Sequence, residues 1–158
     1  MSKIKYIKGD ASAPQGKGVK IIVHICNNIG GWGKGFVLAI SKRWKEPEIS
    51  YRKWHRERAK NDFELGNVQF IQVEKYIYVA NLIGQQGTKT GSKGVPVRYE
   101  AIEKGLEKIA IFAQEIDASI HMPRIGCGLA GGKWHRIEPI IEKTLLEKEI
   151  EVTVYDFD

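Results

Sequence analysis

The sequence predicts an α/β domain in which helices cover both faces of a mixed, largely parallel sheet. Strand-like and helix-like segments alternate after an initial short strand, and one pair of strands has the pattern of a hairpin. Two glycine-rich loops also stand between an apolar run and a helical pattern. Such alternation is typical of parallel strands joined by helices, whereas a hairpin adds an antiparallel pair.

The first half of the chain predicts two strands and two helices. The second strand is almost continuously apolar and β-branched, which is typical of a central strand covered on both faces. The first helix carries an apolar residue at every fourth position and is expected to end before Pro47. The expected segments are strands Lys3–Ile7 and Val19–Cys26, a helix through Phe36, Ile40 and Trp44, and a helix over about Glu48–Lys60.

The second half predicts a hairpin, two amphipathic helices and two further strands. The loop Gly84–Gly94 is rich in glycine and polar residues, so we expect it to be mobile and long enough to serve as a lid. The expected segments are strands Gly66–Val73 and Tyr76–Ile83, a helix over Arg98–Ile116, a strand over Ala118–Met122, a helix from about Trp134 and a strand over Glu151–Phe157.

Length and charge limit the possible function classes. The chain has 158 residues, 42% of them apolar and 28% charged, so we expect one domain with a real core. The net charge of +6 invites a nucleic-acid interpretation. However, the basic residues of Lys42–Lys60 alternate with Glu46, Glu48 and Glu57, which favours a solvated helical face with an auxiliary role in steering anionic substrates.

Cysteine and histidine usage argues against a metal site. Cys26 and Cys127 each stand at the end of an apolar run, where a reduced thiol packs as a small apolar group. The histidines show no metal-binding spacing; they are His24, His55, His121 and His135. No apolar run reaches the length of a membrane span, and the amino terminus lacks a signal-peptide core, so we expect a cytoplasmic protein.

The two glycine loops are candidate phosphate cradles. Gly30–Gly35 follows the second strand, and Pro123–Gly132 contains four glycines in the seven residues from Gly126 to Gly132. Glycines allow backbone N–H groups to converge on an anion that also meets the start of the next helix, so we expect a side chain at Gly126 to occupy ligand space. A plain strand-to-helix turn is the alternative. Two such loops facing each other can hold a diphosphate, which favours a dinucleotide-like ligand.

Neither loop has the pattern of an ordinary nicotinamide-cofactor site or of a Walker loop. Three polar positions beside the loops each have a structural and a functional interpretation. Asp10 can cap a turn or accept a hydrogen bond from an exocyclic amine. Asn27, like Asn28 after it, can hold a ribose hydroxyl or bind the turn backbone. His24 can be a core residue or part of the site.

In combination, these residues resemble the macrodomain family of ADP-ribose-binding α/β modules, over nearly the whole length. The chain looks most like one branch of this family, which contains terminal ADP-ribose glycohydrolases, ADP-ribose-1″-phosphate phosphatases and the macrodomain of a chromatin remodeller. The resemblance implies a three-layer α/β/α macrodomain. The motifs that carry it are Gly9-Asp10, His24-Ile25-Cys26-Asn27, Gly30–Phe36, Arg98-Tyr99-Glu100, Met122–Gly128 and Val152-Thr153-Val154-Tyr155.

The resemblance also implies roles for individual residues. Asp10 would receive the adenine amino group, and Tyr155 would lie against the adenine ring. The second loop would wrap the diphosphate, and the first loop with Asn27 would surround the distal ribose. The implied ligand-binding residues are Asp10, Ala11, Asn28, Gly31, Trp32, Gly33, Lys34, Gly35, Phe36, Ile125, Gly126, Cys127, Gly128, Leu129, Ala130 and Tyr155.

The sequence departs from the glycohydrolase pattern at two positions. Gln85 stands about where those enzymes have a catalytic lysine, and Ala130 stands where they have an aspartate; Lys89 or Lys93 could reach in from the loop. The phosphatase pattern is matched more closely and places His24 and Asn27 at the distal ribose as the candidate catalytic residues. His24 can equally buttress Asn27.

We therefore expect ADP-ribose binding together with processing of an ADP-ribose derivative, by an ADP-ribose-1″-phosphate phosphatase or a mono-ADP-ribosyl hydrolase. The alternative is a non-catalytic reader of ADP-ribose, and a nucleic-acid-binding module is a third reading supported only by charge. We expect a monomer without cofactor or metal and without membrane association. Its partner would be ADP-ribose or an ADP-ribosylated protein or nucleic acid.

Overall fold

Six strands form one mixed sheet in the order β1-β6-β5-β2-β4-β3. The computed structural model describes residues 3–88 and 95–157. Neighbouring strands pair in parallel except for β3 and β4, which form the predicted antiparallel hairpin. The strands are β1 (Lys5–Lys8), β2 (Lys20–Asn27), β3 (Val68–Glu74), β4 (Ile77–Gln85), β5 (Ser119–Met122) and β6 (Val152–Asp156).

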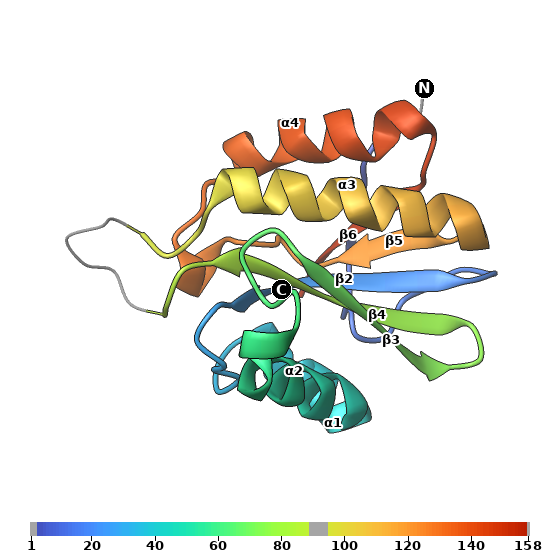
Figure 1. Cartoon of the computed structure of the whole chain (residues 1–158). Helices are drawn as coiled ribbons and strands as arrows, with labels where there is room; N and C mark the ends of the chain where they lie inside the picture. Colours follow the sequence, from blue (N-terminus) through green and yellow to red (C-terminus); the bar gives the residue numbers. More distant parts are fainter. Residues whose placement is uncertain (1–2, 89–94, 158) are drawn as a thin grey trace.

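Helices cover both faces of this sheet, with α3 and α4 on one face and α1 and α2 on the other (Figure 1). The three layers confirm the fold class that the sequence predicts. The helices are α1 (Phe36–Arg43), α2 (Glu46–Arg56), α3 (Tyr99–Ile116) and α4 (Trp134–Thr144), with short 3-10 turns η1 (Arg58–Lys60), η2 (Gly128–Ala130) and η3 (Leu146–Lys148).

The central strand β2 explains why the sheet needs cover on both sides. Ile21 and Val23 belong to the apolar core beneath α3 and α4, whereas Ile22 and Cys26 belong to the core with Tyr51 of α2. Successive side chains of a strand point to opposite faces, so a continuous apolar run fills both cores. Because β2 lies between β4 and β5, its carboxyl end lies near the middle of the side of the sheet where the parallel strands end.

The second helix differs from its predicted bounds. It begins at Glu46 with Pro47 in its first turn, and it ends at Arg56 before the separate 3-10 turn η1. Proline lacks an N–H group, but the first turn of a helix has no partner for that group, so proline fits there. Pro47 therefore marks the start of α2, and α1 ends before it at Arg43.

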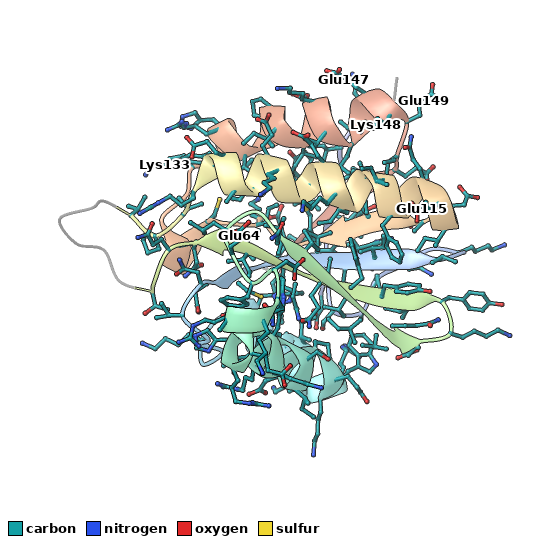
Figure 2. The ribbon with its side chains drawn as sticks, viewed as in Figure 1. Glu64, Glu115, Lys133, Glu147, Lys148 and Glu149 are labelled. Carbon is teal, nitrogen blue, oxygen red and sulfur yellow. The ribbon has the colours of Figure 1, made fainter. Side chains whose placement is uncertain are left out.

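The two ends of α4 lie at opposite edges of the sheet (Figure 2). Lys133 precedes α4 at the edge where β4 ends, whereas Glu147, Lys148 and Glu149 lie at the far end of the helix. The backbone N–H of Lys133 donates to the Tyr99 hydroxyl at 3.0 Å, which ties the start of α4 to the start of α3. The loops that follow the parallel strands therefore meet at one edge of the domain.

Candidate functional site

Three adjoining cavities form one cleft at this edge, with volumes of about 740, 310 and 340 Å³. We name its parts the Asp10 end, the central section and the Asn27 end. Gly35, Phe36 and Pro123 border both the Asp10 end and the central section. Lys34 and Gln85 border both the central section and the Asn27 end. The cleft is therefore continuous, and both predicted glycine loops line it.

At the Asp10 end, the Asp10 carboxylate holds a turn. Its Oδ1 accepts hydrogen bonds from the backbone N–H and the hydroxyl of Ser12, at 2.8 and 2.7 Å. The Arg43 guanidinium lies 3.6 Å from Oδ2. Burial raises the pKa of Asp10, but the Ser12 hydrogen bonds and the Arg43 charge outweigh it and hold the pKa below its ordinary value. The turn role is thus confirmed, and Oδ2 has no hydrogen-bond donor among the described residues.

Two aromatic rings of β6 and its extension line the same end. Tyr155 is buried, and its hydroxyl accepts from the Gln15 backbone N–H at 2.9 Å and contacts His121 Nδ1 at 2.7 Å. Phe157 is 73% exposed and lines the same cavity, which makes it the more accessible ring. The sequence analysis missed Phe157, although strand alternation places it on the same face as Tyr155.

The central section is walled by the loop after β5 and by the start of α1. Gly126 and Gly128 have φ of 73° and 71°, and the Gly132 N–H donates to the Gly126 carbonyl at 2.7 Å. Ile125, Cys127 and Ala130 also line the wall, whereas Leu129 lies within the 3-10 turn η2. Burial raises the pKa of Cys127, which keeps its thiol protonated at neutral pH.

One expectation about this loop is wrong. A Cβ at Gly126 would meet Ile137 at 3.0 Å, Ile102 at 3.1 Å and Val97 at 3.2 Å. It would therefore point into the core beneath α3 and α4 and not into the cleft. The sequence could not show this, because the direction of a missing Cβ depends on the backbone angles of the loop.

The wall opposite this loop is the beginning of α1. Gly35, with φ of 81°, precedes the helix, and Phe36 is the first helical residue. The first N–H groups of a helix have no partner within the helix and carry its positive end, so they favour an anion. The central section thus places a glycine loop and a helix start across from each other.

At the Asn27 end, the Asn27 side chain holds the first glycine loop. Its Oδ1 accepts from the N–H groups of Ile29 and Gly31 at 3.0 and 2.9 Å, and its Nδ2 donates to the Gly31 carbonyl at 2.9 Å. The Tyr51 hydroxyl lies 2.8 Å from the same Oδ1. The turn-binding role of Asn27 is therefore confirmed. The side chain of Asn28 contacts a different segment, since its Oδ1 accepts from the Gly87 N–H at 2.9 Å.

The remaining residues of this loop divide into packed and open positions. Trp32 is 3% exposed, and its Nε1 donates to the Ser41 hydroxyl at 2.7 Å. Gly33 also lines the Asn27 end, and a Cβ built on it meets nothing within 4 Å. Lys34 brings a positive charge to the border with the central section.

His24 lies at the floor of the central section and is 1% exposed. Asn81 donates through Nδ2 to Pro47 and Gln69, so its Oδ1 accepts from His24 Nε2 at 2.6 Å. This tautomer leaves Nδ1 as a buried acceptor without a partner among the described residues. Burial lowers the pKa of His24 to about 4, so the ring is neutral at pH 7.

The structure also places the two residues at which the sequence departs from the glycohydrolase pattern. Gln85 lines the central section and donates to the Gly87 carbonyl at 2.9 Å, and Ala130 is 5% exposed. Lys89 and Lys93, with the loop region 89–94, lie outside the described residues. Within the described ranges, no group of three or more His, Cys, Asp or Glu side chains is arranged to hold a metal ion. No helix there is long and apolar enough to cross a membrane.

Solved structures similar to this chain have the same fold. A protein of unknown function from Bacteroides thetaiotaomicron is 59% identical, with a TM-score of 0.94 and 98% of each chain covered. A macrodomain protein from Streptomyces coelicolor is 58% identical, with a TM-score of 0.89 and coverage of 98% of this chain and 99% of that one. Thermosipho africanus DarTG, solved in complex with ADP-ribose, shares the fold at 18% identity and a TM-score of 0.78, and 42% of its chain is covered.

Curated relatives include both multidomain proteins and single modules. The chain spans only 15% and 18% of the chromodomain-helicase-DNA-binding 1-like proteins of Danio rerio and Mus musculus, at 34% and 31% identity over 96% and 99% of this chain. The ADP-ribose 1″-phosphate phosphatase of Lodderomyces elongisporus is 26% identical, over 98% of this chain and 99% of that protein. The ADP-ribose glycohydrolase OARD1 of Bos taurus is 29% identical, over 98% and 91%.

No family model matches the chain. The family is nevertheless established by the Streptomyces coelicolor macrodomain protein, because 58% identity extends over nearly all of both chains and the backbones superpose. The chain belongs to the macrodomain family, an ADP-ribose-binding family.

Proposed function

We propose that the chain binds ADP-ribose along the whole cleft and acts on a group attached to its distal ribose. The continuity of the cleft carries this proposal, because one ligand can reach from the Asp10 end to the Asn27 end past a diphosphate position in the middle. Adenine lies at the Asp10 end, between Oδ2 of Asp10, whose charged neighbour is Arg43, and the rings of Tyr155 and Phe157.

The central section supplies the anion-binding groups. Residues of the loop 125–130 line the central section together with Gly35 and Phe36 at the start of α1. Converging N–H groups and the positive end of a helix stabilise a diphosphate without a metal ion. Lys34 adds a positive side chain at the border with the Asn27 end.

His24 is the residue proposed for chemistry at the distal ribose. Its neutral ring keeps an unpartnered acceptor at Nδ1, and its centroid lies 6.0 Å from that of Phe36 and 5.4 Å from that of Trp32, two residues that line the cleft. A neutral imidazole can accept the proton of an attacking water. Asn27 then acts as a positioning residue, because its side-chain atoms hold the loop around the ribose.

The similarity to a 1″-phosphate phosphatase and to a glycohydrolase over nearly the full chain supports turnover. The second candidate function is a reader that binds ADP-ribose without turnover. The 1% exposure of His24 favours it, and so do Gln85 and Ala130, which replace the lysine and the aspartate of the glycohydrolase pattern. The two functions share the ligand and differ only in product formation.

Two measurements test the proposal. Calorimetry should show that ADP-ribose binds at least about tenfold more tightly than AMP, because AMP leaves the Asn27 end empty. Equal affinities would overturn the placement of the distal ribose. Incubation with ADP-ribose-1″-phosphate and with mono-ADP-ribosylated protein or DNA then separates turnover from reading. His24→Gln should abolish turnover and keep ADP-ribose binding, whereas the exposed His135→Gln should change neither; tight binding without product from either substrate would identify a reader.

A further inference from the structure

A polar cavity of about 330 Å³ adjoins the Asp10 end of the cleft, because Tyr155 of that end is hydrogen-bonded to Gln15 and His121 of its lining. It is enclosed by the loop that joins β1 to β2, residues 9–19, and by the amino-terminal parts of β1, β5 and β6. The side chains that matter here come from Lys3, Lys5, Gln15, Lys17, Ser119 and His121. A water molecule takes about 30 Å³ of liquid volume, so the cavity has room for a small polyatomic ion.

The charge of this cavity is unbalanced. Three lysines line it, and Glu151 is its one acidic lining residue. In the described ranges, no carboxylate lies within 4.0 Å of the ammonium groups of Lys3, Lys5 or Lys17. Like charges held together without counter-ions repel one another, so a bound anion would stabilise the group.

Lys20 provides an independent observation that points to an anion. It is 8% exposed, and its Nζ donates to the Gly18 carbonyl at 3.0 Å. No carboxylate among residues 3–88 and 95–157 lies within 4.0 Å of it. Lys20 pairs in register with Ser119 of β5, so the two side chains are neighbours on one face. An anion beside Ser119 would supply the counter-charge that Lys20 lacks among the described residues.

The hydrogen bonds around Ser119 determine whether its hydroxyl proton can be donated to a ligand. The Tyr155 hydroxyl accepts from Gln15 N–H at 2.9 Å and lies 2.7 Å from His121 Nδ1, to which it donates in the tautomer that carries the ring proton on Nε2. The proton on His121 Nε2 is then donated to the Ser119 hydroxyl oxygen at 2.8 Å. The Ser119 proton has only the Val19 carbonyl at 3.5 Å as an acceptor among the described residues, which is a weak contact. It is therefore available to an oxyanion.

We propose that this cavity, the Ser119 pocket, is a second anion site that binds a single phosphate group. Lys5 and Lys17 neutralise the phosphate, Ser119 donates a hydrogen bond to it, and Lys20, which pairs in register with Ser119, adds a further positive charge nearby. The group can come from free inorganic phosphate or from a phosphate monoester. The pocket shares no lining residue with the ADP-ribose cleft, but Tyr155 of the Asp10 end is hydrogen-bonded to Gln15 and His121 of its lining.

Residue-resolved NMR titration tests this site on the full chain. Inorganic phosphate and ribose 5-phosphate are added separately, and the amide signals of Gln15–Lys17 and Ser119 are followed together with those of Gly126–Gly128 in the cleft. We expect saturable shifts at the Ser119 pocket with inorganic phosphate; a similar affinity for ribose 5-phosphate would identify the monoester as a source. Shifts confined to Gly126–Gly128, or spread evenly over exposed lysines, would overturn the site.

Matched variants complete the test. Lys5→Ala/Lys17→Ala should weaken phosphate binding at the Ser119 pocket at least about tenfold, because two of its neutralising charges are lost. Lys53→Ala/Lys60→Ala removes the same charge from the exposed surface of α2 and η1 and should leave the affinity unchanged. All four lysines are exposed, so both variants should fold, which thermal unfolding checks. Equal affinities in the two variants would refute the pocket as the binding site.

Discussion

The two glycine loops have similar compositions but are stabilised by different groups. The loop after β2 is held by side chains: Asn27 bonds its backbone, the Tyr51 hydroxyl accepts from the Gly30 N–H at 3.1 Å, and His55 packs against Gly30. The loop after β5 is held by its own backbone, including hydrogen bonds from Gly131 N–H to Gly128 and from Gly132 N–H to Gly126.

Each loop contains both closely packed and open glycines. In the loop after β5, a Cβ on Gly132 would lie 2.3 Å from the Gly126 carbonyl oxygen, and a Cβ on Gly126 would enter the core. In the loop after β2, Gly33 faces open space. In the loop after β2, however, a Cβ on Gly30 would lie 2.4 Å from His55 Nδ1, and in the loop after β5 a Cβ on Gly128 would meet nothing within 4 Å. The two loops therefore differ in the groups that hold them and not in how closely their glycines are packed.

The largest effect is expected from Gly126→Glu. The substitution forces a side chain into a position with φ of 73° and directs a carboxylate toward Ile102 and Ile137. Overpacking, left-handed backbone strain and a buried charge together should lower the free energy of unfolding by about 4 kcal/mol or more. Denaturant unfolding measures this change; a variant as stable as the wild type would show that the loop after β5 is not packed against the core.

The next effect is the pH dependence of stability that arises from the imidazole ring of His24. The pKa of His24 is about 4 in the folded chain against an ordinary 6.5. The unfolded state therefore binds more protons between these values, so stability is complete above pH 6.5 and falls as the pH drops toward 4. The shift corresponds to about 3 kcal/mol.

Unfolding of wild type and His24→Gln at several pH values tests this linkage. His121, with a pKa also lowered to about 4 by burial and Lys20, should retain its own share of the pH dependence in the variant. The slope should therefore decrease without vanishing in His24→Gln. An unchanged slope would mean that His24 is not buried in its neutral form.

A smaller effect, on binding alone, is expected from Gly33→Glu. The side chain enters open space at the Asn27 end, so stability should stay within about 0.5 kcal/mol of wild type. Its negative charge would lie near the proposed diphosphate and should weaken ADP-ribose binding about thirtyfold, or about 2 kcal/mol. Gly33→Gln, of similar size but uncharged, should bind more tightly than Gly33→Glu in calorimetry. Equal losses in both variants would assign the effect to size and not to charge.

The smallest effect is expected from Tyr51→Phe. The change removes the hydroxyl that contacts the Asn27 carbonyl at 2.6 Å and accepts from Gly30 N–H, while the ring remains in the core. Loss of these hydrogen bonds should lower the free energy of unfolding by about 1 kcal/mol. Hydrogen exchange should also become faster at Gly30 and Gly31, but not at Gly131 and Gly132. Equal acceleration in both loops would contradict the difference in how they are held.

The sequence by itself determined the fold class, the central strand, the hairpin, the amphipathic helices and the positions of both glycine loops. These features follow from local patterns: Val19–Cys26 is apolar on both faces, Phe36 and Ile40 share one helical face, and glycines cluster after strands. The same patterns carried the family resemblance. Most of the predicted ligand-binding residues were placed in one cleft because the carboxyl ends of parallel strands meet at one edge.

Only the tertiary structure decided how individual polar atoms are used. It assigned Oδ1 of Asp10 to Ser12, the Asn27 amide to the loop backbone and the Nε2 proton of His24 to Asn81. It also added Phe157 to the cleft and brought Lys5, Lys17 and Ser119 together in a second pocket. These outcomes depend on contacts between residues far apart in the chain, and on backbone angles that set the direction of each side chain, and neither is contained in a local pattern of residue types.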